Sequence, residues 1–334
     1  ASQHAGHRQC RDRGGDRATI TDANLVLGRL NPDYFLAGAV KIDAEKARAA
    51  IEQDVGGPLG LDLHAAARAV IDIANAKMVA ALQFVSIQRG IDPRQYVLVP
   101  SGGAGPLHAV AIARALGVKT VLVPPTPGLN SALGLLATDV KHDFVRTQFT
   151  PSAALDLGLL KTVLGEMADA GRTLLAEERV DASRMEILRE AEICYVGQSY
   201  PLRVRIPEDW THLVATLETA FHDAHRALYG FASPGEATMV LNLRVTALGR
   251  VDRPQLERLA TGDGDPGQAL KGTRCVVFAQ PADCPIYERS RLEGGDRIEG
   301  PAIIEQMDST TVLPAGASLC VDGGGSLIIE LLEP

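Results

Sequence analysis

The sequence predicts an α/β protein whose last part is rich in strands, and three observations carry this prediction. Residues 97–99 (Val-Leu-Val) form a short apolar run typical of a covered parallel strand, and residues 120–123 form a second one. Between them lie a glycine turn and a helical stretch over residues 107–116, which ends at Gly117. Strand, helix and strand in this order make a βαβ unit. From residue 274 to residue 330, short strand patterns alternate with glycine and proline turns, which predicts a β-rich terminal module.

The composition is that of an ordinary globular chain. Of its 334 residues, 46% are hydrophobic and 22% are charged. The formal net charge of -8 argues against non-specific binding of nucleic acid, which needs a basic surface. No apolar run approaches the roughly 20 residues of a membrane span, and no signal peptide opens the chain, so we expect no membrane partner. The cysteines are scattered without a CxxC pair, which predicts reduced thiols in a cytoplasmic protein. They are Cys10, Cys194, Cys275, Cys284 and Cys320.

The glycine turn at residues 101–105 (Ser-Gly-Gly-Ala-Gly) is a candidate binding site. Its three glycines allow a tight bend and leave no Cβ between the backbone and a ligand. Pro106 then suits the first turn of a helix, and a glycine-lined helix N-terminus after a strand can bind a phosphate or a nucleotide. The turn has neither the Lys-Ser/Thr of a Walker loop nor the Gly-x-Gly-x-x-Gly spacing of dinucleotide folds. From the residues alone, a nucleotide site and a purely structural turn both stay open.

Asp22 is a tentative catalytic carboxylate. Residues 18–28 pass into a helical pattern, and Thr21 or Asp22 is in place to cap that helix. The Asp22 carboxylate either serves as this cap or faces a cleft. The polar residues 1–17 lack periodicity, which predicts a disordered or aberrant N-terminal segment. The alternative for this segment is a metal site built from His4, His7 and Cys10.

Two further helices are predicted before the glycine turn. Residues 43–55 form a surface helix that Asp43 caps and that the glycine pair after it ends. A longer helix covers about residues 62–89. Its apolar positions recur mostly at steps of three and four, which predicts one buried stripe. They are Ala66, Val70, Ile73, Ala74, Met78, Ala81 and Val85. Asn75 and Lys77 interrupt this stripe, and we expect them to face solvent.

A proline-rich loop and a second region follow the βαβ unit. Residues 124–134 predict a stiff loop that ends in a helix cap at Asn130 or Ser131. A loop at the carboxyl end of a parallel strand is where α/β folds place ligand contacts. Later patterns predict helices over 155–180 and 210–231, paired strands over 184–206 and a strand over 238–247. His222 and His225 lie three residues apart, but no third ligand is near in the sequence, so no metal site is predicted.

Several motifs occur in a fixed order along the chain. They are TITDANLVLG (19–28), SGGAGPLHA (101–109), YVGQSY (195–200), NLRVTA (242–247) and GPAIIE (300–305). Together they resemble the hydantoinase A / 5-oxoprolinase family, which includes N-methylhydantoinase A and the beta subunit of acetone carboxylase. The resemblance runs from about Gly14 to the end of the chain.

The resemblance implies a ribonuclease-H-like lobe of the actin, hexokinase and Hsp70 type, in which two lobes clamp ATP. Residues 18–147 would form the second lobe, and residues 148–334 a C-terminal α+β domain that ends in the β-rich module. The nucleotide would contact Ser101, Gly102, Gly103, Ala104, Gly105 and His108. Both phosphate loops of the family lie upstream of the residues matched here, and the family pattern is absent at residues 7–13. The chain is therefore expected to be a C-terminal portion that lacks the N-terminal lobe.

The implied activity is the ATP-dependent opening of a cyclic amide of the hydantoin or 5-oxoproline type. In such enzymes ATP with Mg²⁺ activates the carbonyl of a lactam or imide by phosphorylating its oxygen, so that water opens the ring. The implied partners are a hydantoinase B-like subunit and the N-terminal lobe, within an oligomer. Two alternatives remain: a subunit of an ATP-dependent ketone carboxylase resembling the acetone carboxylase beta subunit, and a non-catalytic scaffold fragment.

Overall fold

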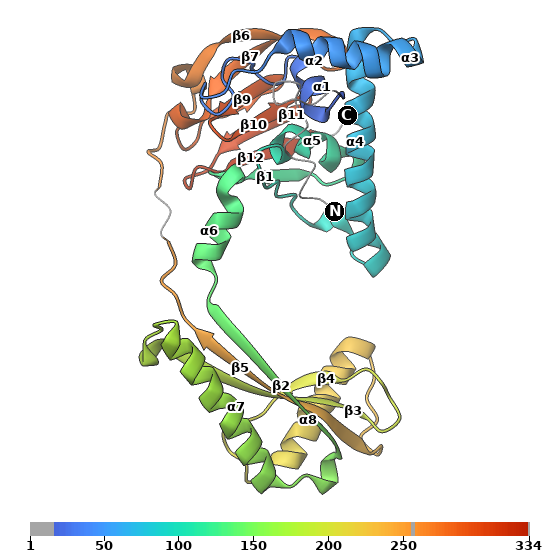
Figure 1. The fold of residues 1–334 in the computed structure, drawn as a ribbon, viewed down its shortest axis with the longest axis vertical. Helices are drawn as coiled ribbons and strands as arrows, with labels where there is room; N and C mark the ends of the chain where they lie inside the picture. The colour runs from blue at the N-terminus through green and yellow to red at the C-terminus, as the bar shows by residue number, and fades with distance from the viewer. Residues whose placement is uncertain (1–16, 255–257, 333–334) are drawn as a thin grey trace. The chain divides into compact units, whose positions relative to one another are not determined.

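The computed structural model describes residues 17–254 and 258–332, which form two compact units (Figure 1). The first unit comprises Ala1–Gly134 and Gln255–Pro334, and the second, Leu135–Pro254, is inserted into it. The sequence instead places a boundary after residue 147 and treats the last strands as a separate module. The difference arises because those last strands pair with strand 120–123, about 200 residues earlier in the chain. The predicted aberrant segment, with His4, His7 and Cys10, lies outside the described residues except at Arg17.

Eight strands build two sheets in the first unit. They are β1 (Thr120–Val123), β6 (Leu270–Val277), β7 (Pro281–Glu288), β8 (Arg297–Glu299), β9 (Ala302–Gln306), β10 (Ser309–Leu313), β11 (Ala317–Val321) and β12 (Leu327–Leu331). One sheet has the order β1-β12-β11-β8 with antiparallel neighbours. The other has the order β10-β9-β7-β6, and in it β7 and β9 run parallel. The predicted strand-and-turn character of the C-terminal part is confirmed.

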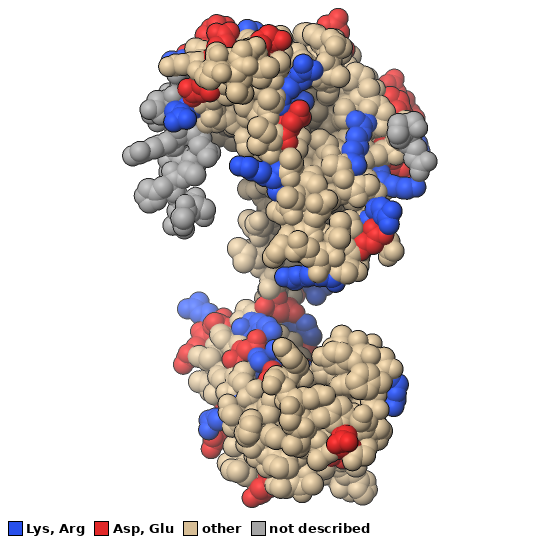
Figure 2. Space-filling model, turned by 90° about the vertical axis from the view of Figure 1, so that its right-hand side faces the viewer, with Lys and Arg blue, Asp and Glu red and all other residues tan. Residues whose placement is uncertain are grey.

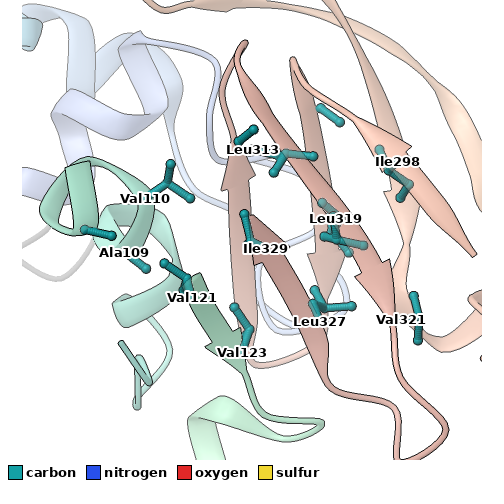
Figure 3. Close-up of a cluster of buried hydrophobic side chains, with 14 of the residues drawn as sticks. Ala109, Val110, Val121, Val123, Ile298, Leu313, Leu319, Val321, Leu327 and Ile329 are labelled. Carbon is teal, nitrogen blue, oxygen red and sulfur yellow. The ribbon is translucent and has the colours of Figure 1, made fainter. Parts of the chain in front are cut away.

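The first unit also contains six described α-helices, of which α5 packs directly on the strands. They are α1 (Ile20–Val26), α2 (Ala44–Ile51), α3 (Gly57–Leu59), α4 (Leu63–Val85), α5 (Gly105–Leu116) and α6 (Asn130–Ala137), which crosses into the second unit. Helix α5 ends where the sequence predicts it, with Gly117 in the left-handed conformation, and begins at Gly105, two residues before the predicted start. Its Ala109 and Val110 point toward Val121 of β1 and Ile329 of β12, as Figure 3 shows. This contact joins the predicted βαβ unit to the C-terminal strands in one core.

The ends of the first two helices differ from the sequence expectation. Thr19, rather than Thr21 or Asp22, caps α1, because the Asp22 N–H donates to Thr19 Oγ1 at 3.2 Å. Asp43 caps α2 as predicted. The glycine pair that follows does not end this helical region, because both glycines keep right-handed helical angles. The chain stays helical until Gly60, whose φ of 64° stops it.

The predicted buried strand at residues 97–99 is wrong in its burial and extent. Only an isolated parallel bridge between Leu98 and Val121 forms there. Val97 and Val99 are 50% and 49% exposed. Residues 97–99 run parallel to β1, as the predicted βαβ unit requires. Within the described residues, however, this strand has no neighbour on its other edge.

Helix α4 has 23 residues and is capped by Asp62, close to the predicted span. The predicted stripe is wrong toward its C-terminal end, where Ile73 and Val85 are 60% and 49% exposed. Lys77 is exposed as expected, whereas Asn75 contacts His108 at 2.8 Å instead of solvent alone. The stretch Leu63–Arg89 is also long and apolar enough to cross a membrane by length and composition, which the sequence inspection did not anticipate. This is weak evidence for a span, since one side of the helix packs on the first unit.

The predicted cap at Asn130 or Ser131 is wrong as well. A helical turn at Pro127–Leu129 leads directly into α6, and Asn130 itself has helical angles of -57° and -35°. The Asn130 side chain therefore does not cap the helix; its Nδ2 donates to Ser101 of the glycine turn instead.

The second unit is an antiparallel sheet with two helices on one face; the predicted helices and the strands after residue 184 are confirmed, whereas the strand over 140–151 was not predicted. Its elements are β2 (Val140–Pro151), α7 (Leu157–Glu177), β3 (Met185–Tyr195), β4 (Leu202–Arg205), α8 (Leu213–Tyr229) and β5 (Thr238–Gly249), and the strand order is β2-β5-β3-β4. Both helices contribute to one hydrophobic core, in which Phe221 is fully buried and lies edge-on to Tyr195.

We expect Phe221→Ala to destabilise the second unit by about 3–5 kcal/mol, because it opens a cavity in this core. Trp210, the single tryptophan of the chain, packs against the same core, so its fluorescence during urea unfolding reports on this unit. The control is Leu228→Ala on the same helix, where the side chain is 62% exposed and the expected change is below about 0.5 kcal/mol. Equal effects of the two substitutions would contradict the packing described.

Candidate functional site

Three segments meet at the glycine turn of residues 101–105. The Gly102 N–H donates to the carbonyl of Pro127 at 2.7 Å. Asn130 Nδ2 donates to Ser101 Oγ at 2.9 Å. Gln306 Nε2 donates to the carbonyl of Pro125 at 2.8 Å. These bonds link the glycine turn, the proline loop (124–129) and the hairpin tip (306–309) that joins β9 to β10.

Asp308 at the hairpin tip packs against two glycines. A Cβ added to Gly103 would lie 2.7 Å from the Asp308 carbonyl oxygen, and one added to Gly128 would overlap the Asp308 carboxylate. Gly102 is required for a different reason, since its φ is 83° while the space around it is open. Sequence reasoning attributes the missing Cβ atoms to a close ligand. At Gly103 the closely approaching group is instead a segment of the same chain.

A hollow of about 200 Å³ opens beside this contact, in the first unit. Gly103 and Ala104 form one wall at the start of α5. Apolar side chains such as Leu30, Phe35 and Met307 form much of the remainder. Thr21, the neighbour of Asp22, also lines it. The structure therefore brings two of the predicted nucleotide-binding residues to a concave surface.

The hairpin tip beside this hollow also contains buried polar atoms that have no partner among the described residues. Gln306 Oε1, Asp308 Oδ2 and Ser309 Oγ are buried without a hydrogen-bond partner among the described residues, and all three residues line the hollow. Buried polar groups are usually hydrogen-bonded, so such a cluster calls for an explanation. Among the residues that line the hollow, apolar side chains occur beside polar ones such as Thr21, Asn31 and Thr310. This combination suits an organic ligand that carries both hydrogen-bonding groups and an apolar face.

A network of charges supports the opposite wall. Glu305, only 2% exposed, accepts bonds from Lys271 Nζ at 2.7 Å and from Arg274 Nη1 at 2.9 Å. The hydroxyl of Tyr34 donates to Glu288 at 2.6 Å. Burial and this bond raise the pKa of Tyr34 to about 12, so the phenol keeps its proton at neutral pH. Tyr34 and Glu305 both line the hollow, and the network fixes their positions.

The structure gives Asp22 a capping role. Its carboxylate accepts from the Thr19 N–H at 2.9 Å and from Thr19 Oγ1 at 2.7 Å, and the residue is 2% exposed. These bonds complete a capping box at the start of α1. Its role in catalysis stays a prediction.

His108 lies in the core and not at the hollow. It is 5% exposed, and its Nδ1 is 2.8 Å from Asn75 Oδ1 on α4. Burial, followed by the nearby charge of Arg29, lowers its pKa, which keeps the imidazole neutral. Gly105 opens α5 against Pro100. Contact of either residue with a nucleotide stays a prediction.

Sequence reasoning missed the hairpin tip and the loop that carries Tyr34. Glu305 closes the GPAIIE motif, which was a usable signal for this wall. Nothing in the local pattern marks Asp308, because its significance comes from glycines roughly 180 and 200 residues away. Within the described residues, no group of three or more His, Cys, Asp or Glu side chains could hold a metal ion.

Comparisons with known proteins find matches over nearly the whole chain. A family model described as hydantoinase/oxoprolinase matches residues 1–144, and one described as the hydantoinase/oxoprolinase C-terminal domain matches residues 158–329. Caprolactamase subunit alpha of Pseudomonas jessenii is 32% identical over 321 residues, which cover 94% of this chain and 46% of that subunit.

Solved structures agree with these matches. A nucleotide-free structure of acetone carboxylase, which carries out ATP-dependent acetone carboxylation, aligns with a TM-score of 0.83 and 27% identity over 97% of this chain and 48% of the other. The ATP-dependent caprolactamase from Pseudomonas jessenii aligns with a TM-score of 0.74 and 30% identity over 99% and 49%. The chain thus spans about half the length of the curated relatives it matches.

We expect Gly103→Ala to destabilise the first unit by about 1–3 kcal/mol, because the new methyl group displaces the hairpin tip. Urea unfolding followed by circular dichroism would measure this. Gly165→Ala is the control: Gly165 lies inside α7 with open space around it, so alanine should be neutral or stabilise by up to about 1 kcal/mol. A neutral result for Gly103→Ala would contradict the tight contact with Asp308.

Acid should weaken the first unit through His108. Because the folded-state pKa of His108 lies below its ordinary value of 6.5, the unfolded chain binds the proton first as the pH falls. This contribution to stability is therefore complete above pH 6.5 and is lost below it, by at most about 1.4 kcal/mol per pH unit. His108→Gln should flatten the dependence of unfolding free energy on pH between 7.5 and 5.5. Parallel curves for the two proteins would exclude this role.

Proposed function

The chain belongs to the hydantoinase/oxoprolinase family, and we propose that it acts as the C-terminal part of an ATP-dependent enzyme that opens cyclic amides. Family membership confirms the resemblance that the motifs indicate. The family includes an ATP-dependent caprolactamase, whose substrate is a lactam by its name, and this supports a cyclic amide of the hydantoin, 5-oxoproline or lactam type. The choice of a cyclic amide as the substrate of this chain is part of our proposal.

The observation that carries this proposal is the hollow beside Gly103 and Ala104. Its apolar walls, with polar residues such as Asn31 and Thr310 among them, suit the base and ribose of a nucleotide. We therefore assign the adenosine part of ATP to this hollow, in a lobe of the ribonuclease-H type.

The described residues fit the organic part of the nucleotide better than its metal-bound phosphates. They contain no carboxylate or histidine cluster for Mg²⁺. The phosphates and Mg²⁺ are therefore assigned to an N-terminal lobe that contains the family's phosphate loops. ATP would supply the activation of the amide carbonyl toward water. This chain would position the nucleotide through the glycine turn and the hairpin tip, in a complex with a hydantoinase B-like subunit.

A second candidate is a subunit of an ATP-dependent ketone carboxylase. One observation favours it: the backbone aligns with acetone carboxylase at a TM-score of 0.83 and with caprolactamase at 0.74, although the sequence identity is slightly higher for caprolactamase. Both reactions begin with a carbonyl group that ATP activates. They differ in what attacks next, water or a carboxylating species.

The two candidates are separated by ADP release. This chain would be co-purified with the part of caprolactamase subunit alpha that it does not match, and Mg²⁺-ATP would be added with 5-oxoproline, hydantoin, a lactam, or acetone with bicarbonate. Release driven by cyclic amides supports the first function, and release that needs acetone and bicarbonate supports the second. Absence of ATP binding and of ADP release in the assembled complex would contradict both and indicate a scaffold.

We expect Ala104→Leu to weaken ATP binding at least tenfold in this complex, because the larger side chain occupies the hollow. Isothermal titration would measure the Kd. The matched control is Ala111→Leu, an exposed position on the same helix outside the hollow, which should leave the Kd unchanged. An unchanged Kd for Ala104→Leu would contradict the assignment of adenosine to this hollow.

A further inference from the structure

Helix α4 is apolar on two sides, and the described part of the first unit covers one of them. Met78, Val79 and Leu82 pack on the main core. A second apolar stripe recurs at steps of three and four on the opposite side and continues into the turn after the helix. It consists of Ile73, Ala76, Ala80, Phe84 and Ile87, all of them exposed. We call this stripe the outer face of α4.

The outer face is unusual for a surface helix. Ile73, Phe84 and Ile87 are 60%, 60% and 52% exposed. Scattered single exposures are normal on proteins, but a helix that is apolar all round is typically buried. Figure 2 looks onto the side on which α4 lies in Figure 1, and uncharged residues dominate this side of the first unit. A continuous apolar stripe of this kind marks an interface.

Strand 97–99 also has one edge without a neighbouring strand among the described residues. Leu98 bonds to β1 through both of its backbone groups: its N–H donates to the Thr120 carbonyl at 3.0 Å, and its carbonyl accepts from the Leu122 N–H at 2.9 Å. Backbone groups alternate in direction along a strand, so those of Val97 and Val99 point to the other edge. Among the described residues they have no hydrogen-bond partner.

The side chains of this strand indicate the same missing layer. Val97 and Val99 are half exposed, although parallel strands are normally covered on both faces. The linker between α4 and the strand continues the apolar character with exposed Ile91 and Tyr96. The unpaired edge and the outer face of α4 are therefore joined by about ten residues of exposed, partly apolar chain.

We infer that this edge and the outer face of α4 form one interface, and that its occupant is the half of the family chain that this sequence does not span. That half would add a strand beside residues 97–99 and pack an apolar element over α4. The relatives support this occupant, since both solved structures contain nearly all of this chain within chains about twice as long. Only the identity of the partner rests on the proposed function; the interface requires no nucleotide and no turnover.

Two other occupants fit less well. A bilayer would have to accommodate Lys77, which lies midway along α4 on its exposed side, and a cation in the membrane core is costly. A second copy of the chain could cover the helix. A two-fold axis would, however, pair the 97–99 edge antiparallel with itself, whereas the existing bridge to β1 is parallel.

The strand edge can be tested with a pair of substitutions at one position. Val99→Pro removes an N–H that has no acceptor in the described part of the chain, and Val99→Thr keeps both the N–H and the shape. Each variant of the full chain would be titrated, without nucleotide, with the segment of caprolactamase subunit alpha that this chain does not match. We expect Val99→Pro to weaken binding at least tenfold and Val99→Thr to leave it within twofold, with both variants folded by circular dichroism.

The helix face has its own matched pair. Phe84→Asp should weaken the same complex at least tenfold, because it buries a charge in an apolar interface. Leu228→Asp, at a comparably exposed leucine of the second unit, should not change it. Hydrogen exchange should slow at Val97 and Val99 on binding, while the Leu98 amide, which is already bonded, changes little.

A positive control keeps the test decisive. The same segment must bind the matching half of its own subunit. If it does so and shows no binding to this chain, the inference is overturned. Equal loss with Val99→Pro and Val99→Thr would also overturn it, as would Phe84-dependent dimerisation of the chain alone or Phe84-dependent binding to phosphatidylcholine vesicles. Failure of ATP binding in an intact complex would contradict the proposed function and leave this interface standing.

Discussion

The structure of the first unit depends on the contact of one hairpin with two glycines. Asp308 lies where side chains of Gly103 and Gly128 would otherwise be, so the glycine turn, the proline loop and the β9–β10 hairpin can approach one another only without Cβ atoms at those positions. Hydrogen bonds from Gly102 and Gln306 to carbonyls of the proline loop then hold the three segments together. The hollow exists because this junction closes one side of it and leaves the other open.

Both interpretations of the glycine turn that the sequence leaves open are compatible with this junction. The turn is structural, since Gly103 accommodates the backbone of its own chain. It also contributes to a concave surface, since Gly103 and Ala104 line the hollow on their remaining side. A ligand there would contact the turn together with residues of the hairpin tip such as Met307. A site of this kind needs residues from both ends of the first unit, which explains why the pairing of β12 with β1 matters for it.

Local patterns predicted much of the fold where each element packs against near neighbours. The helices and most strands of the second unit follow periods of 3.6 and 2, because their core is formed by elements near one another in the sequence. Helix α5 was predicted from its own apolar pattern and its glycine end, although its core includes distant C-terminal strands. The pairing of β1 with β12 had no local signal, so the inserted unit was not foreseen. The Asp308 contact was missed for the same reason. The candidate site residues were predicted from the glycine turn and the helix that follows it. Gly103 and Ala104 do line the hollow, whereas His108 lies in the core.

The failures of burial prediction are concentrated within residues 73–99 and therefore carry information. Apolar periodicity records where a side chain is buried in the functional molecule, whichever segment covers it. In the first unit the errors fall at Ile73, Val85, Val97 and Val99, on α4 and the strand that follows it. An error of propensity would scatter among helices and strands alike. A missing layer produces errors that cluster, with exposed apolar side chains beside an unpaired strand edge, and this is the pattern found here.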